Sequence, residues 1–406
     1  MARYLFVHQN FPGQFPHIAK ALAERGDSVV AIGEDKRIKQ RAALHPRIVL
    51  AGYPEPKGAS PQTHHYLYQF EAHIRRGQAV FRACQDLLKK GFRPDVVVAH
   101  PGWGETLFLK DAFPRARHIH YLEFFYRAEG SDVDFDPEFP CGLDDRCRVR
   151  LKNATQLTGL EYADAGISPT HWQKSQYPLD WQPRIHQLHD GIDTARACPA
   201  AAATLELGTL RLSRNDEVIT YVARNLEPYR GFHTLMRAIP LLLQQRPKAH
   251  IVVVGGNDVS YGRKPSGTTS YRELYEQEWG SKVDVSRVHF TGKLPYAQYM
   301  KVLQVSSLHL YLTYPFVLSW SLLEAMSAGC VVLGSDTAPV KEVISDGHNG
   351  FLTDFFDAKK LAMRASELLQ NRGALDAVRS NARSTVVEKY DLQSRCLPDM
   401  LNFYSI

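Results

Sequence analysis

The sequence predicts an α/β protein with two doubly wound, Rossmann-like domains. Short apolar runs rich in Val, Ile and Leu alternate with helical or polar segments, which is typical of parallel strands buried on both faces. The alternation falls into two sets, so we expect one sheet in each half of the chain. A length of 406 residues fits two domains of ordinary size.

Strands of the first set are expected over residues 4–8, 28–32, 47–51, 95–100, 118–123 and 166–168. Those of the second set are expected over residues 219–224, 250–255, 288–292, 309–314, 330–335 and 350–353. We predict a first domain over residues 1–195, a second over 196–385, and a C-terminal helix over 386–406 that packs back on the first domain. Ligands of open α/β sheets collect at the carboxyl ends of strands, so two facing sheets imply a central cleft.

The composition is that of an ordinary globular protein, with 44% hydrophobic and 23% charged residues. The six cysteines show no metal-ligand spacing, no apolar run is long enough to span a membrane, and the N-terminus shows no signal-peptide pattern. We therefore expect a cytoplasmic protein. The net charge of +6, without an aromatic-basic array, does not indicate nucleic-acid binding. Peripheral contact with an anionic inner membrane face stays open as an alternative.

The segment 314–333 predicts a strand end, a loop, a short helix and a second buried strand. Ser319 can cap the helix, whose free amides favour an anion. Glu324, just over one turn into that helix, can accept hydrogen bonds from sugar hydroxyls. An anion next to hydroxyl groups indicates a nucleotide. A plain strand-helix-strand unit with a surface glutamate explains the segment about as well.

Other candidate residues follow predicted strands. Gly13 lies in the loop after the first strand and permits close approach of a ligand. His100 ends the strand 95–100 before a glycine-containing loop. Arg224 and Arg230 bracket a turn and could hold a diphosphate through paired hydrogen bonds. Gly256 ends another strand, where a base or ribose could lie. Each of these residues also has an ordinary structural explanation.

Together these motifs resemble the retaining GT-B glycosyltransferases of family 4, also called group 1. In that family a Glu-Gly-Phe-Gly-Leu motif is followed by a second Glu eight residues after the first, and Glu324 matches this second, ribose-binding Glu. Phe316 occupies the position of the first Glu, whose carboxylate contacts the donor sugar, and a phenylalanine cannot accept a hydroxyl hydrogen bond. The resemblance also places Gly13 near the donor phosphates and His100 against the transferred sugar.

The family has an arginine and a lysine after the first strand of its second domain. Arg224 matches the arginine, and Arg230 replaces the lysine after one extra residue. The resemblance further implies that Leu294 lines the nucleobase pocket. It also implies that the amides around Leu318 and Ser319 stabilise the leaving diphosphate.

The resemblance therefore implies a hexosyltransferase-like enzyme that moves a sugar from a nucleotide-sugar to a glycan, lipid-linked or small-molecule acceptor, with retention of anomeric configuration. It implies no cofactor and no protein-bound metal, and the acidic run 132–138 lacks EF-hand spacing. Two alternatives stay open. One is a nucleotide-sugar epimerase of the same fold, and the other is a sugar-nucleotide binding protein without catalysis.

Overall fold

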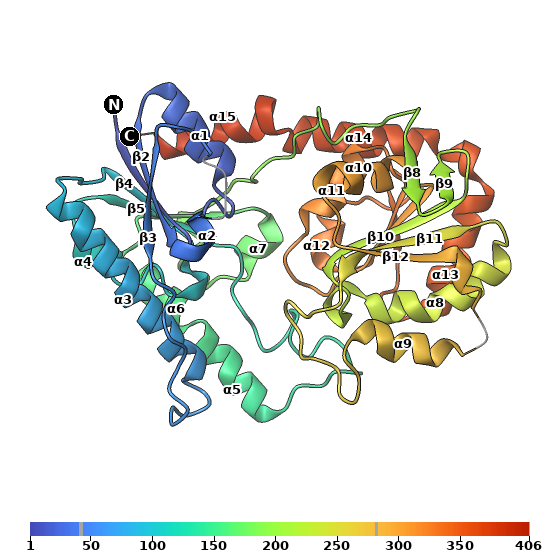
Figure 1. Cartoon of the computed structure of the whole chain (residues 1–406), viewed down its shortest axis with the longest axis horizontal. Helices are drawn as coiled ribbons and strands as arrows, with labels where there is room; N and C mark the ends of the chain where they lie inside the picture. The colour runs from blue at the N-terminus through green and yellow to red at the C-terminus, as the bar shows by residue number, and fades with distance from the viewer. Residues whose placement is uncertain (40–43, 281–282, 406) are drawn as a thin grey trace. The chain divides into compact units, whose positions relative to one another are not determined.

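The computed structural model describes residues 1–39, 44–280 and 283–405 (Figure 1). By internal contacts the chain divides into two compact units. The first unit contains Met1–Gly191 and Gln393–Ile406, and the second contains Ile192–Leu392. Each unit is built around one parallel sheet with helices packed against it, which confirms the predicted fold class.

The sheet of the first unit has the strand order β3-β2-β1-β4-β5-β6-β7. Its strands are β1 (Arg3–Val7), β2 (Ser28–Glu34), β3 (Ile48–Tyr53), β4 (Val96–Ala99), β5 (Arg117–Tyr121), β6 (Ala165–Ser168) and β7 (Ile185–Gln187). The helices of this unit are α1 (Pro16–Arg25), α2 (Asp35–Lys39), α3 (Tyr68–Lys89), α4 (Leu109–Ala112), α5 (Leu143–Lys152), α6 (Ala154–Tyr162), α7 (His171–Ser175) and α15 (Leu397–Tyr404).

The sheet of the second unit has the order β12-β11-β10-β13-β14-β15, and a separate antiparallel hairpin joins β8 to β9. Its strands are β8 (Thr204–Leu207), β9 (Leu210–Ser213), β10 (Val218–Asn225), β11 (His250–Gly256), β12 (Val288–Gly292), β13 (Leu308–Tyr311), β14 (Val332–Ser335) and β15 (Phe351–Thr353). The helices are α8 (Phe232–Gln245), α9 (Tyr271–Trp279), α10 (Tyr296–Val305), α11 (Trp320–Ser327), α12 (Ala338–Lys341), α13 (Ala358–Gln370) and α14 (Asp376–Tyr390).

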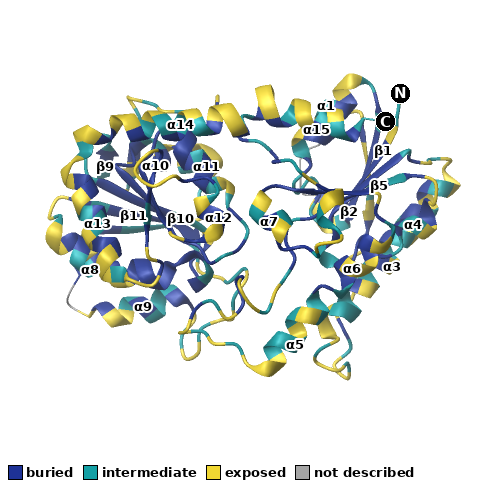
Figure 2. Ribbon diagram, turned by 180° about the vertical axis from the view of Figure 1, so that it is seen from behind, coloured by how far each residue is buried: buried dark blue, intermediate teal, exposed yellow. Residues whose placement is uncertain are grey.

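The sheets form the buried centre of each unit, as the dark strands of Figure 2 show. Helix α1 illustrates how the sequence specifies the covering helices. Proline at its first position suits a helix start, and Gly26 ends it with a φ of 100°, a left-handed conformation that favours glycine. Its buried side chains recur on one face and cover the sheet; they are Ile18, Ala19, Leu22 and Ala23.

The last helix, α15, returns to the first unit and packs beside α1 (Figure 1). Cys396, Met400 and Tyr404 belong to the same core cluster as Tyr4 and Phe6, and the Tyr4 hydroxyl donates to the Tyr404 carbonyl over 3.1 Å. The chain changes units at 191/192 and 392/393 instead of the predicted 195/196 and 385/386. The later change occurs because α14 continues unbroken to Tyr390 and packs on α11 in the core of the second unit.

Strand β7 and the hairpin β8–β9 are the elements that the sequence analysis missed. β7 has three residues, of which one is buried, so it carries no apolar run. In the hairpin, exposed Glu206 lies opposite Arg211, and buried Leu205 lies opposite Leu212. This one-sided pattern differs from the continuous apolar runs of the parallel strands.

None of the helices in the described ranges is both long and apolar enough to cross a membrane.

Candidate functional site

In both sheets, the predicted site residues lie near the point where the strand order reverses. β1 lies between β2 and β4, and β10 lies between β11 and β13. At such a switch point the loops leave neighbouring strands in opposite directions and open a crevice at the carboxyl edge, where ligands bind. Gly13 and His100 follow β1 and β4 in the first unit. Arg230 and Ser319 follow β10 and β13 in the second unit.

The start of α11 in the second unit is capped as the sequence predicts. Ser319 has an extended backbone, and its Oγ accepts a hydrogen bond from the Ser321 amide over 3.3 Å. The Ser319 amide donates to the Tyr311 hydroxyl over 2.8 Å, so this amide is already engaged inside the protein. The Leu318 amide has no acceptor among the residues that the structure describes, while its side chain is buried in the core.

Glu324 lies one turn into α11 and is held by hydroxyl groups. The hydroxyls of Tyr296 and Tyr299 donate to its two carboxylate oxygens over 2.9 and 2.8 Å. Burial raises the pKa of Glu324, while the two tyrosine hydrogen bonds and the charge of Arg196 oppose this effect. Each carboxylate oxygen has more than one lone-pair direction, so Glu324 keeps capacity for further hydroxyl donors.

The two arginines of the predicted diphosphate clamp have different surroundings. Arg224 is exposed near the end of β10, and its side chain has no hydrogen-bond or ion-pair partner within the described ranges. Arg230 is buried in the 3-10 turn Pro228–Arg230. Its Nη1 donates to Thr313 Oγ1 over 2.8 Å and to the Val317 carbonyl over 3.0 Å. Arg230 therefore braces the loop after β13, and Arg224 is the arginine available to a ligand.

The ring of Phe316 is buried among other aromatic side chains. Its side chain is 3% exposed and packs edge-on against Tyr229 and Tyr261, at centroid distances of 5.6 and 4.8 Å. Tyr314 lies 4.7 Å from Tyr229, and these four residues form what we call the aromatic cluster. The Arg230 guanidinium carbon lies 5.8 Å from the centre of the Phe316 ring. Phe316 thus packs against Arg230 instead of presenting an open apolar face.

Glu227 is a buried residue at this edge that the sequence analysis missed. Its carboxylate is fully buried and accepts hydrogen bonds from three successive amides, those of Ser260, Tyr261 and Gly262, over 2.8, 3.1 and 2.9 Å. This contact fixes the loop after β11 and brings Tyr261 against Phe316 and Arg230. In the sequence, Glu227 resembles any loop glutamate, because its partners are backbone groups more than 30 residues away.

A pocket of about 330 Å³ opens at the end of β11. A Cβ atom at Gly256 would lie 2.5 Å from Lys293 Cε and 2.6 Å from Asn225 Oδ1, so a side chain there would displace the ends of these two side chains. Leu294, the predicted nucleobase contact, is not one of the lining residues. Its side chain packs against the core cluster below the β8–β9 hairpin, and the neighbouring Lys293 faces the pocket instead. The pocket is lined by Leu226, Gly255, Gly256, Asn257, Asp258, Arg272, Phe290, Gly292 and Lys293.

In the first unit, His100 is buried at the carboxyl end of β4. Its Nδ1 accepts a hydrogen bond from the Gly102 amide over 3.0 Å, so in the neutral ring the proton is on Nε2. Nε2 lies 3.4 Å from Glu123 Oε2, and the ring stacks on Trp103 at 4.5 Å. Glu123 also accepts from Gln14 Nε2 over 3.2 Å, which links the loop after β1 to the loop after β5.

Gly13 has a φ of 52°, and a Cβ atom there would lie 2.5 Å from His8 Nε2. The His8 ring meets the His100 ring edge-on at 5.4 Å. Gly13, His8 and His100 therefore gather at one edge of the first sheet. Gly13 and His100 were predicted as site residues from the sequence, whereas His8 and Glu123 were predicted only as strand ends.

No group of three or more His, Cys, Asp or Glu side chains in the described parts of the chain is arranged to hold a metal ion.

Comparison with known families shows two matching models. The model of the glycosyl transferase family 4 group matches residues 25–197, and the model of the glycosyl transferases group 1 matches residues 209–385. Over 181 residues the chain is 24% identical to an uncharacterized glycosyltransferase of Methanocaldococcus jannaschii, covering 44% of this chain and 42% of that one. It is 26% identical over 182 residues to a D-inositol 3-phosphate glycosyltransferase of Streptomyces avermitilis, covering 43% and 37%. The matched region spans less than half the length of these curated relatives.

Solved structures share the fold over the whole chain. HepE of Anabaena, solved with UDP and glucose, aligns with a TM-score of 0.69 at 17% identity and covers 99% of both chains. Sucrose-phosphate synthase of Thermosynechococcus elongatus aligns with a TM-score of 0.75 at 17% identity and covers 100% of this chain and 98% of that one. Each half of the chain thus matches a glycosyltransferase family model, the second half that of group 1, and the chain has the GT-B fold.

Proposed function

We propose that the chain transfers a sugar from a nucleotide-sugar donor to an acceptor hydroxyl with retention of anomeric configuration, and that the second unit holds the donor nucleotide. The observation that carries this proposal is that the unengaged guanidinium of Arg224 and the hydroxyl-binding carboxylate of Glu324 lie at the ends of the neighbouring strands β10 and β13, at one switch point. A ribose and a diphosphate need these two kinds of group. HepE, which shares the fold, has been solved with UDP and with UDP-glucose.

The bond between the anomeric carbon and the diphosphate oxygen breaks, and the oxygen of the acceptor hydroxyl takes its place on the same face of the sugar, while the hydroxyl proton passes to the released diphosphate. Negative charge grows on the leaving diphosphate, which Arg224 and the Leu318 amide stabilise. Arg230 contributes by donating to the Thr313 hydroxyl and to the Val317 carbonyl. The Val317 carbonyl belongs to the same peptide group as the Leu318 amide, so this contact orients the amide. The pocket at Gly256 receives the base, and His100 orients the sugar.

Product analysis tests this proposal against its alternatives. The chain is incubated with UDP-, GDP- and ADP-sugars and a panel of glycan, lipid-linked and small-molecule acceptors, and the products are followed by NMR. A glycoside with the donor's anomeric configuration and an equal amount of nucleoside diphosphate is the expected result. A free epimerised nucleotide-sugar would indicate an epimerase, binding without any product would indicate a non-catalytic protein, and an inverted product would refute retention.

Replacing Glu324 with glutamine is expected to weaken nucleotide binding at least about tenfold, because a hydrogen bond to a charged acceptor contributes about 1.5–3 kcal/mol. Calorimetry with the free nucleoside diphosphate measures this loss. If Glu324 only binds ribose, the pH dependence of turnover keeps its wild-type shape. A shifted pH profile with intact affinity would assign proton transfer to Glu324 instead.

Replacing Glu123 with alanine is expected to lower kcat about tenfold, because His100 Nε2 loses the carboxylate that orients its ring. Glu123→Gln is the matched control, since its amide oxygen can still accept from Nε2 and should restore most of the rate. KM for the donor nucleotide should change little in both variants. An equal loss in both variants would show that the negative charge matters, and an unchanged rate in the alanine variant would remove Glu123 from the site.

A further inference from the structure

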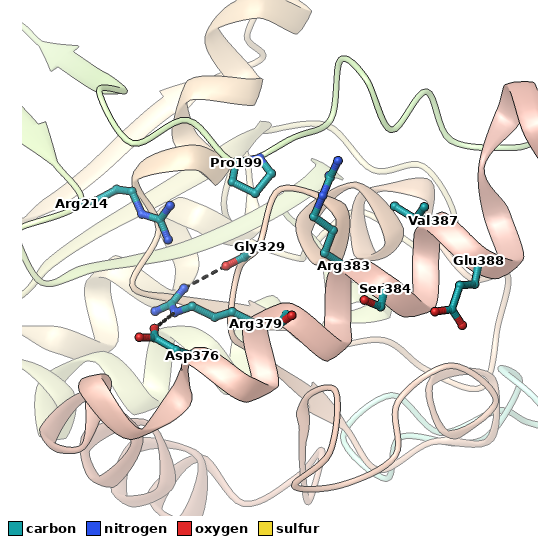
Figure 3. A pocket seen from close by; sticks show the side chains of 10 residues that line it. Pro199, Arg214, Gly329, Asp376, Arg379, Arg383, Ser384, Val387 and Glu388 are labelled. Carbon is teal, nitrogen blue, oxygen red and sulfur yellow. Dashed lines mark hydrogen bonds and ion pairs between the residues drawn. The ribbon is translucent and has the colours of Figure 1, made fainter.

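A second pocket of the second unit, of about 570 Å³, lies at the opposite edge of its sheet (Figure 3). Helix α14 forms one wall, and Pro199, Gly329 and Arg214 form others. Arg214 precedes β10 and Gly329 precedes β14, so both lie at the amino ends of strands. Arg224 and Glu324 lie at the carboxyl edge, and this pocket therefore differs from the proposed donor site.

The pocket contains three arginines, and we call it the arginine pocket. Two of the three have internal partners. Arg379 donates to the Gly329 and Ser307 carbonyls, each over 3.0 Å, and Arg383 donates to the Ser327 carbonyl over 2.6 Å. The Ser327 and Gly329 carbonyls lie at the end of α11, where a helix favours positive charge, and the Ser307 carbonyl directly precedes β13. A structural role accounts for these contacts.

Arg214 has no such explanation. Its side chain is half-buried, and it has no hydrogen-bond or ion-pair acceptor among the residues described by the structure. Figure 3 shows its guanidinium extending into the pocket towards that of Arg379. The carboxylate nearest to Arg379 is Asp376, at 4.0 Å, and its side chain is 86% exposed. Two guanidinium groups therefore share one wall, while the other carboxylate of the lining, Glu388, lies farther along α14.

The lowered pKa of Arg379 agrees with two guanidinium groups lying close together in this wall. Burial lowers the pKa of Arg379, and the nearby positive charges of Arg214 and Arg372 lower it further, while Cys330 and Asp376 act in the opposite direction. An anion between Arg214 and Arg379 would relieve the repulsion and supply the acceptor that Arg214 lacks. On the same helix, Ser380 and Ser384 add hydroxyl donors to the lining.

We propose that the arginine pocket is a second binding site, separate from the donor site, that takes a small phosphomonoester with its phosphate between Arg214 and Arg379. Paired guanidinium groups match the oxygen geometry of a phosphate. A volume of about 570 Å³ exceeds the needs of a bare phosphate and leaves room for an organic group. This proposal goes beyond sugar transfer and does not depend on it.

The test is calorimetric titration of the full chain with inorganic phosphate and with glycerol 3-phosphate at constant ionic strength. Saturable binding of glycerol 3-phosphate is expected, with weaker binding of inorganic phosphate. Arg214→Gln should lower the affinity at least about tenfold, and it should not unfold the chain, because this side chain has no internal acceptor in the described structure. Equal affinity for both probes would contradict a role for the organic group.

Two matched variants remove the same charge elsewhere. Arg211→Gln changes an exposed arginine of β9 outside the pocket, and Arg224→Gln changes the proposed donor site. Both should leave glycerol 3-phosphate binding unchanged. Binding that is lost with Arg224→Gln and kept with Arg214→Gln would place the ligand at the donor site and overturn the proposal. The absence of saturable binding at millimolar concentrations of either probe would also overturn it.

Discussion

Replacing Arg224 with alanine is expected to lower kcat roughly 30- to 1,000-fold, which corresponds to about 2–4 kcal/mol of transition-state stabilisation. Arg224 is exposed at the end of β10 and has no partner in the described parts of the protein, so its charge is available to a leaving diphosphate. For the same reason its removal should leave the melting temperature unchanged. The rate of nucleoside diphosphate release, at matched concentrations of folded protein, measures the effect.

Arg211→Ala is the matched control for Arg224, because it removes an exposed arginine from β9 of the same unit. Its rate should equal that of the wild-type chain. Wild-type turnover in Arg224→Ala would remove this residue from the diphosphate site. Equal losses in both variants would indicate a general effect of net charge, not a local contact with the leaving group.

Replacing Phe316 with glutamate is expected to lower activity with the native donor about 100-fold and to destabilise the second unit by about 3 kcal/mol or more. The buried ring packs against Tyr229 and Tyr261, and a glutamate gives up these contacts. Its carboxylate would also lie near Arg230 and compete with Thr313 and Val317 for that guanidinium. The loop after β13 would then lose the two hydrogen bonds that Arg230 donates to it.

Phe316→Leu separates the two effects of the glutamate variant. Leucine keeps an apolar side chain without adding a charge, so most of the activity should remain while stability falls moderately. Urea unfolding and donor turnover are measured on the same preparations. If Phe316→Glu instead raises turnover with an ordinary hexose donor, the pocket is arranged for the family's carboxylate, and the structural role of the aromatic cluster is wrong.

The fold was largely predictable because its parallel strands are buried on both faces. Apolar runs such as Tyr4–Val7 and Val96–Ala99 are visible in the sequence without knowledge of their neighbours. Strand β7 and the hairpin β8–β9 were missed because they are short or buried on one side. The chain returns to the first unit at 392/393, and the predicted boundary at 385/386 lies too early because nothing in the sequence marks where α14 stops contacting α11.

The places of the candidate site residues in the fold were easier to predict than their hydrogen-bond partners. Strand ends and turns placed Gly13, His100 and Ser319 at sheet edges, and the structure finds them there. The hydrogen bond from Arg230 to Thr313 and the three amide hydrogen bonds that Glu227 accepts join loops that are far apart in the chain. Periodicity and spacing carry no signal for such contacts, which only the folded chain brings together.

The most direct test of the donor site is a thermal-shift panel of the full chain with UDP-, GDP- and ADP-sugars. A ligand at about 100 times its Kd stabilises the native state by about 2.7 kcal/mol. We predict that sugars of one nucleotide raise the melting temperature by several degrees, and that Arg224→Ala and Glu324→Gln each reduce this shift. The absence of a shift with every nucleotide-sugar, or a shift that both variants retain in full, would contradict a donor nucleotide held by Arg224 and Glu324.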